Sequence, residues 1–163
     1  MKAAVFSDTH HNTEPMLEAV RLCRPDLIIH LGDHDRDTLC LEREFPDIPL
    51  YRVCGNCDFA PIAPIADIVP IGPVKALICH GHTYNVDWGG VDSLVYAAEE
   101  QGASLALFGH THRAFHEQVG GVTLLNPGTA GKGSDLTWAM VTIFDNGAIS
   151  CEIRDFHSAA GAP

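Results

Sequence analysis

Five short apolar segments of the sequence each end in side chains that can bind a metal ion. Runs of this length, bounded by glycine and polar residues, are typical of buried strands. Because the pattern recurs five times, it favours one shared site over unrelated loop residues. The runs and the residues that follow them are 3–6 before Ser7-Asp8-Thr9-His10, 27–31 before Gly32-Asp33, 50–53 before Gly55-Asn56, 76–79 before His80, and 104–108 before Gly109-His110-Thr111-His112.

The elements between these runs predict where the polar residues meet. Apolar residues recur at helical spacing after Thr13, more weakly from Asp37 to Phe45, and again before Gly102. Alternating strands and helices imply right-handed crossovers, and the binding site of such a sheet lies outside the carboxyl ends of its strands. Because side chains in extended chain alternate faces, we expect His110 and His112, two residues apart, to point the same way. The residues expected to converge are Asp8, His10, Asp33, Asn56, His80, His110 and His112.

The last third of the sequence carries hairpin signals instead. Residues 114–119 and 122–125 flank Gly120-Gly121, and a second pair of runs, 138–144 and 148–153, flanks an Asp-Asn-Gly turn. A βαβ first half followed by antiparallel hairpins predicts an α/β fold of two sheets packed face to face, with helices outside. No linker or repeat interrupts the sequence, so we expect a single domain over residues 1–163.

Composition and charge restrict the class of partner. With 46% hydrophobic and 19% charged residues, the 163-residue chain can bury a core. Its net charge of −11 disfavours nucleic acid as the main partner, so an anionic substrate would need bound cations to attract it. No secretory signal is visible, and the apolar stretch 60–71, which we expect to be a loop, holds Asp67 and three prolines. We therefore expect no membrane span and a cytoplasmic location.

Cysteines and isolated histidines invite other interpretations. Four cysteines fall in apolar helix or strand patterns, which favours free, buried thiols over disulfides: Cys23, Cys40, Cys79 and Cys151. Cys54-Gly55-Asn56-Cys57 has redox spacing, but it straddles a predicted ligand and has no second cysteine pair, which disfavours the redox reading. His30 lies inside an apolar run and is expected in the core. His116 and His157 are expected to face solvent.

Five motifs in this order resemble those of the calcineurin-like metallophosphoesterases. They are Asp8-Thr9-His10, Gly32-Asp33, Gly55-Asn56-Cys57-Asp58, His80-Gly81-His82 and Gly109-His110-Thr111-His112, with Asn126-Pro127-Gly128 following. The small size and the Cys-Asp pair resemble the compact bacterial and archaeal branch of YfcE-like phosphodiesterases, and the match spans residues 8 to 128. The resemblance implies a four-layer αββα sandwich of two mixed sheets flanked by helices.

The resemblance also implies a centre with two divalent metal ions. Asp8, His10 and His112 would bind one ion, Asn56, His80 and His110 the other, and Asp33 would bridge them. Carboxylate, imidazole and amide ligands suit Mn²⁺, which we expect first, or Fe, Ni or Zn. A metal-bridging hydroxide would attack phosphorus in line.

The sequence departs from many relatives at Cys57, where they carry a histidine that contacts the phosphate. A thiol is a poor general acid, so esters with good leaving groups should react best unless another side chain supplies the proton. His82, two residues after His80, is the first candidate for a catalytic role beside Asn56. His11 and His34 each adjoin a ligand and are expected to point away from the centre, and His34 and Cys57 are assigned to the substrate pocket. Asp58 could tether a ligand histidine.

Three functions fit these motifs. The first is a phosphodiesterase acting on a small phosphate ester, and the second is a phosphomonoesterase of the same architecture. The third is a non-catalytic scaffold like the retromer subunit Vps29, which shares the fold, and the full set of seven ligands disfavours it. The sequence leaves the substrate and a homo-oligomeric state open.

Overall fold

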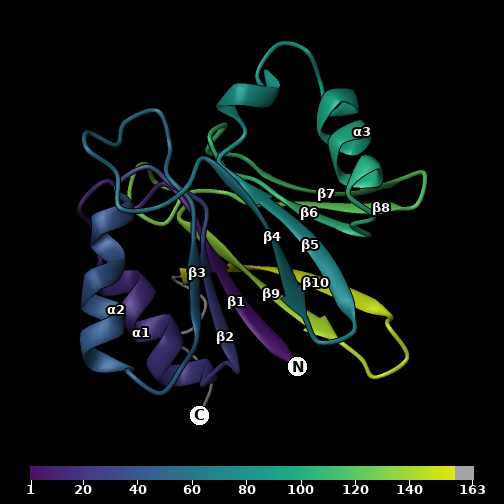
Figure 1. Cartoon of the computed structure of the whole chain (residues 1–163). Helices are drawn as coiled ribbons and strands as arrows, with labels where there is room; N and C mark the ends of the chain where they lie inside the picture. The colour runs from purple at the N-terminus through teal and green to yellow at the C-terminus, as the bar shows by residue number, and fades with distance from the viewer. Residues whose placement is uncertain (157–163) are drawn as a thin grey trace.

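The computed structural model describes residues 1–156, and its strands form two five-stranded sheets. Strands alternate with helices up to β3, β4 and β5 then form an antiparallel hairpin, and the last four strands form two more hairpins (Figure 1). The elements are β1 (Lys2–Phe6), α1 (Glu14–Cys23), β2 (Leu27–His30), η1 (Asp35–Thr38), α2 (Leu39–Glu44), β3 (Leu50–Arg52), β4 (Ala66–Ile71), β5 (Val74–Cys79), η2 (His82–Tyr84), α3 (Asp92–Glu100), β6 (Leu105–Leu107), β7 (Ala114–Val119), β8 (Val122–Pro127), β9 (Thr137–Ile143) and β10 (Ile149–Asp155).

The first sheet has the strand order β10-β9-β1-β2-β3. Its strands β1, β2 and β3 run parallel, whereas β9 pairs antiparallel with β1 and with β10. The β1 and β2 strands are buried on both faces, which explains why they read as continuous apolar runs. One face packs against α1, whose Met16, Leu17 and Val20 are buried with Phe6 of β1.

The second sheet has the order β4-β5-β6-β8-β7, with β5, β6 and β8 parallel. Its outer face packs against α3 through Leu94, Val95 and Ala98, which share a cluster with Leu124 of β8. The facing sides of the two sheets form a third apolar cluster, for example through Val5 and Ile78. Two central sheets with helices outside make the expected four-layer αββα sandwich of mixed sheets (Figure 1).

Most predicted elements are present, but one stretch differs. The sequence places residues 60–71 in a loop, whereas Ala66–Ile71 forms strand β4. This expectation was wrong, because the segment pairs antiparallel with β5 despite its proline. Since β4 lies at the edge of its sheet, Pro70 needs no second strand partner.

Several smaller expectations are also settled by burial. His30 is fully buried and His116 is exposed, as expected, while His157 lies outside the described residues. All six cysteines are free, but of the four expected to be buried only Cys79 is buried, whereas Cys23, Cys40 and Cys151 are half-buried. Within residues 1–156, no helix is both long and apolar enough to cross a membrane.

Candidate metal centre

The loops that follow the parallel strands meet where the two sheets adjoin. Backbone hydrogen bonds join them: the amide of Asp8 donates to Gly32 O over 3.0 Å, and the amide of Gly109 donates to His80 O over 3.0 Å. The amide of Ala130 donates to Ser7 O over 2.9 Å. Strand ends from both sheets therefore contribute to one site.

Close packing at this junction depends on several glycines, of which Gly109 and Gly55 are examples. A Cβ atom on Gly109 would overlap the hydroxyl of Ser7, and one on Gly55 would overlap the carboxylate of Asp33. The loop that carries His110 and His112 can therefore approach β1 only because position 109 has no side chain.

Five of the seven predicted ligands have left-handed backbone conformations, with φ between 43° and 71°. Non-glycine residues adopt this conformation infrequently, and clusters of such residues mark functional sites. Because the chain is not extended there, the expectation that His110 and His112 point the same way does not hold. The His112 ring faces Asp8 and His10, whereas the His110 ring lies 5.1 Å from that of His80. The five residues are Asp8, His10, Asp33, His110 and His112.

One half of the centre, which we call the compact half, brings four predicted ligands together. Asp8, His10, Asp33 and His112 each place a ligand atom within 4.8 Å of the others. His112 Nε2 lies 3.1 Å from Asp8 Oδ1 and 3.3 Å from His10 Nε2. His10 Nε2 is 3.7 Å from Asp33 Oδ2. Two carboxylates and two imidazoles in this space form a donor set suited to a transition-metal ion.

His80 begins the other half, which we call the split half. Its Nδ1 lies 2.7 Å from Leu31 O and must carry the proton, since a carbonyl oxygen can only accept. In the neutral ring, Nε2 therefore presents a lone pair, and it lies 3.3 Å from Asp33 Oδ1 and 3.9 Å from Asp8 Oδ1. A histidine whose other nitrogen donates to a backbone carbonyl is oriented as metal-ligating histidines are.

Two buried polar atoms at the heart of the centre lack hydrogen bonds among the described residues, namely Asp8 Oδ1 and His80 Nε2. Both side chains are fully buried. Leaving such a group unsatisfied costs roughly 1–3 kcal/mol, and more for a charged one. Cations bound to these two lone-pair donors would remove that cost, so the residues fit bound metal.

Neighbouring charges alter the pKa values of the compact half. Burial alone would raise the pKa of Asp8, but the His112 and His80 imidazoles hold it below its usual value. The carboxylate of Asp8 raises the pKa of His112, whereas burial lowers the pKa of His10. Asp8 therefore remains a carboxylate, the form in which it can bind a cation.

Asn56 lies on an exposed turn after β3, and its amide nitrogen is 3.6 Å from the Sγ of Cys57. The turn is fixed to the centre because the amide of Cys57 donates to Asp33 Oδ1 over 2.9 Å. Burial, followed by the nearby Asp33, raises the pKa of Cys57 to about 11. A redox cysteine needs a lowered pKa, so this thiol lacks the property that the C-x-x-C spacing would require.

Asp58 shapes this turn rather than contacting a ring. Among the described residues, its two carboxylate oxygens accept hydrogen bonds from the amides of Asp35 and Gly55, at 2.8 and 2.6 Å. The tether to a ligand histidine expected from the sequence is not among these contacts.

His110 has a partner that the sequence did not reveal. Its Nε2 lies 2.5 Å from the Oδ2 of Asp87, in the segment between η2 and α3. No strand or recurrent motif precedes Asp87, so its only sequence signal is an acidic residue near His82. The ring of His82 lies 5.4 Å from that of His80 and 6.1 Å from that of His110.

His34 differs from its expected position. Its ring lies 5.2 Å from that of His10 and 3.9 Å from that of His11 instead of pointing away from the centre. Both His11 and His34 have positive φ, so the alternation of extended chain does not apply to them. With Asp37 they form a second group of three potential ligands whose donor atoms lie within 4.8 Å of one another.

A four-layer sandwich with carboxylates and imidazoles at the adjoining strand ends defines the metallophosphoesterase class. The model of the calcineurin-like phosphoesterase superfamily domain matches residues 1–146, and the chain belongs to that superfamily. A relative from Bacillus subtilis (strain 168), named a probable metallophosphoesterase, YsnB, is 33% identical over 132 residues. That alignment covers 79% of this chain and 75% of the relative.

Two solved structures share the fold at lower identity. An archaeal phosphodiesterase superposes with a TM-score of 0.71 and 22% identity, over 94% of this chain and 100% of the other. Vps29 from Entamoeba histolytica in complex with zinc superposes with a TM-score of 0.74 and 22% identity, over 96% of this chain and 99% of the other. At these identities the two structures support the fold alone.

Proposed function

We propose that the chain is a metal-dependent phosphodiesterase whose centre holds two divalent ions. Asp33 is central to this proposal because one of its oxygens faces His10 and the other faces His80. The observation that carries it is the pair of buried, unsatisfied atoms, Asp8 Oδ1 and His80 Nε2. In the proposed arrangement Asp8, His10 and His112 would bind one ion, Asn56, His80 and His110 would bind the other, and Asp33 would be shared between them.

The charge of the centre explains how an acidic protein would attract a phosphate ester. The chain has a net charge of −11, so its overall field repels anions. Two divalent ions would carry a total charge of about +4. The carboxylates of Asp8 and Asp33 would offset about two of these positive charges. When bound, such ions supply an acidified water and a positive field at the phosphoryl oxygens. The mixed ligand set favours Mn²⁺, Fe, Ni or Zn over Mg²⁺, and Mn²⁺ is our first choice.

Proton supply to the leaving group limits the range of good substrates. Cys57, with a pKa of about 11, holds its proton too tightly to act as an acid. Burial, with the nearby His80 and His110, lowers the pKa of His82, so this ring is mostly neutral at pH 7. Esters whose leaving groups depart without added protonation are therefore the preferred substrates.

The experiment that tests the proposal measures metal content and hydrolysis together. Purified protein is stripped of metal, reloaded with Mn²⁺, and assayed with a chromogenic phosphodiester and the matching monoester. We expect two metal ions per chain and metal-dependent hydrolysis that is faster for the diester. A reversed preference would indicate the phosphomonoesterase, and fully loaded protein that hydrolyses neither ester would support the Vps29-like scaffold.

The role of His82 is tested with phosphodiesters of graded leaving-group pKa. Wild type should slow steeply as the leaving group becomes more basic, and His82→Ala should show the same dependence. A shallow dependence in wild type that becomes steep in His82→Ala would instead show that His82 donates the proton.

A cytoplasmic location and a homo-oligomeric state stay predictions.

A further inference from the structure

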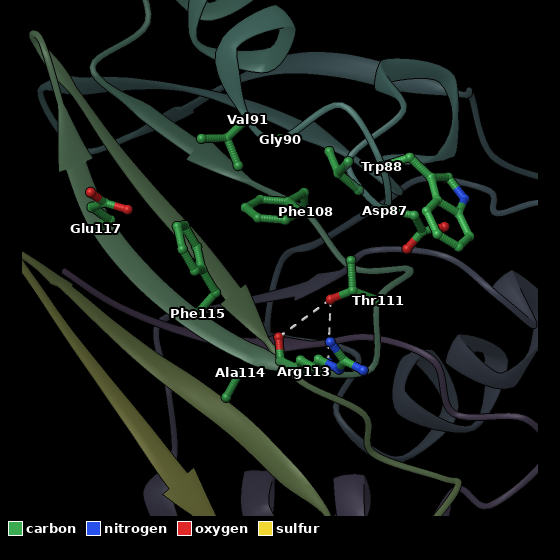
Figure 2. A pocket seen from close by; sticks show the side chains of 11 residues that line it. Asp87, Trp88, Gly90, Val91, Phe108, Thr111, Arg113, Ala114, Phe115 and Glu117 are labelled. Atoms are coloured by element: carbon green, nitrogen blue, oxygen red, sulfur yellow. Dashed lines mark hydrogen bonds between the residues drawn. The ribbon is translucent and has the colours of Figure 1, made fainter.

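A groove of about 660 Å³ lies directly beside the metal centre, and no predicted ligand lines it. Figure 2 shows Phe108 and Phe115 on its wall, with Trp88 and Asp87 at one end and Glu117 at the other. A volume of this size lies in the range of small-molecule sites. The groove is therefore large enough to receive the organic part of a phosphate ester.

The groove and the centre are parts of one surface because they share a loop and an ion pair. Phe108, Thr111 and Arg113 line the groove, and they alternate along the chain with His110 and His112. Asp87 lines the groove and also pairs with His110. A phosphate held at the centre would therefore direct its substituent toward the groove.

The walls favour a planar aromatic ring. The rings of Phe108 and Phe115 lie 6.0 Å apart in an edge-to-face arrangement, and the Trp88 side chain is 91% exposed at the mouth. Stacking on aromatic side chains tolerates many bases because every base has a π-face. Polar groups at both ends, Asp87 and Glu117, can accept hydrogen bonds from the edge of a base or a sugar.

A positive charge at the same place favours an anionic ligand. Arg113 lines the groove next to His112, and among the described residues its guanidinium makes no ion pair. A cation beside apolar walls suits a ligand with a phosphate at one end and an aromatic body at the other.

We propose that this groove binds the nucleoside portion of a nucleotide ester whose phosphate lies at the metal centre. The inference rests on the proposed function and adds to it a substrate class and the residues Trp88, Phe115 and Arg113. It implies that affinity depends on the organic part of the ligand as well as on its phosphate.

The test uses phosphonates, which share a phosphate-like head but resist hydrolysis. Mn²⁺-loaded protein is titrated by calorimetry with methylphosphonate, phenylphosphonate and the methylene phosphonate analogue of adenosine 5′-monophosphate. The adenosine analogue should bind roughly ten- to a hundred-fold more tightly than methylphosphonate, with phenylphosphonate between them.

Three variants assign this preference to the groove. Phe115→Ala and Trp88→Ala should each weaken the adenosine analogue by about ten-fold and methylphosphonate by less than two-fold. Arg113→Gln should weaken all three ligands to a similar extent. The matched control is Phe144→Ala, which also removes an exposed aromatic ring, since Phe144 is 51% exposed. Phe144 does not line the groove. It follows β9 of the first sheet, next to Ile143, whose amide donates to Met1 O. The control variant should bind all three ligands as wild type does.

The outcomes separate the two proposals. If wild type binds none of the phosphonates, the proposed function fails. If it binds methylphosphonate but prefers neither aromatic ligand, the groove inference alone is overturned. An adenosine preference that survives both Phe115→Ala and Trp88→Ala also overturns it, because the ring would then lie elsewhere.

Discussion

The compact half and the split half of the metal centre are built differently. In the compact half, four ligand atoms already lie within 4.8 Å of one another. The split half combines a fully buried His80 with a partly exposed His110, paired to Asp87, and with Asn56 on an exposed turn. The protein alone therefore organises one of the two proposed ion sites closely, whereas the other proposed site would depend on surface segments. The halves should consequently differ in metal affinity and in their sensitivity to mutation.

The largest expected effect comes from Asp33, the residue shared by both halves. Asp33→Asn removes a negative charge between the two proposed ions, so both should bind weakly and diester hydrolysis should fall more than a hundred-fold. Mass spectrometry measures the metal content, and steady-state kinetics measures the turnover of the diester. Two ions per chain with near-normal turnover in this variant would contradict the bridging role.

The next prediction concerns the support beneath the compact half. The amide of Gly32 donates to His30 Nδ1 over 3.3 Å, so Nε2 carries the proton and donates to Thr9 Oγ1 over 3.2 Å. Thr9 Oγ1 in turn donates to Asp37 over 2.7 Å. Burial lowers the pKa of His30 from 6.5 to about 4, which agrees with this neutral ring.

His30 should therefore make the fold sensitive to acid. Between pH 6.5 and 4 the unfolded chain binds a proton that the folded chain excludes, so stability present above pH 6.5 is lost as pH falls through this window. The loss attributable to this ring should reach roughly 3 kcal/mol. Urea unfolding of metal-free wild type, His30→Leu and the exposed control His116→Leu measures it. His30→Leu should lower stability at pH 7 but flatten its pH dependence, and equal slopes in all three proteins would count against a buried neutral ring.

A smaller effect is expected where the two halves meet. Gly109→Ala places a methyl group against Ser7 and should cost about 2 kcal/mol of unfolding free energy while displacing the loop with His110 and His112. Gly121→Ala is the control, since a Cβ there meets nothing within 4 Å, and it should change stability by less than about 0.5 kcal/mol. Equal stabilities of the two variants would show that the loop can move without cost.

The smallest predicted effect isolates the split half. Asp87→Asn removes the charge beside His110, and the second metal ion should bind about ten-fold more weakly while the first is unchanged. Stepwise titration with Mn²⁺, monitored by calorimetry, resolves the affinities of the two ions. Equal weakening of both ions would mean that the two halves are not independent.

Sequence patterns predicted the strands and the convergence of their ends because burial imposes apolar runs and parallel strands share an edge. They did not predict ring directions, since left-handed backbone at residues such as His34 and His110 cancels the alternation of extended chain. Asp87 was missed because its role depends on a tertiary contact with His110 and not on a local motif. Strand β4 was missed because an edge position, invisible in the sequence, makes Pro70 acceptable.

The hydrogen bond from His80 to Leu31 has a mechanical consequence. His80 follows a strand of the second sheet, and Leu31 follows β2 of the first, so this bond crosses between the sheets. In the proposed arrangement, a cation held by His80 together with Asp33 would clamp the same seam with a stronger attachment. Ligands that bind only the folded chain raise its stability in proportion to the logarithm of their concentration. Melting temperature should then rise with free Mn²⁺, and separating the two sheets should become the slow event in unfolding.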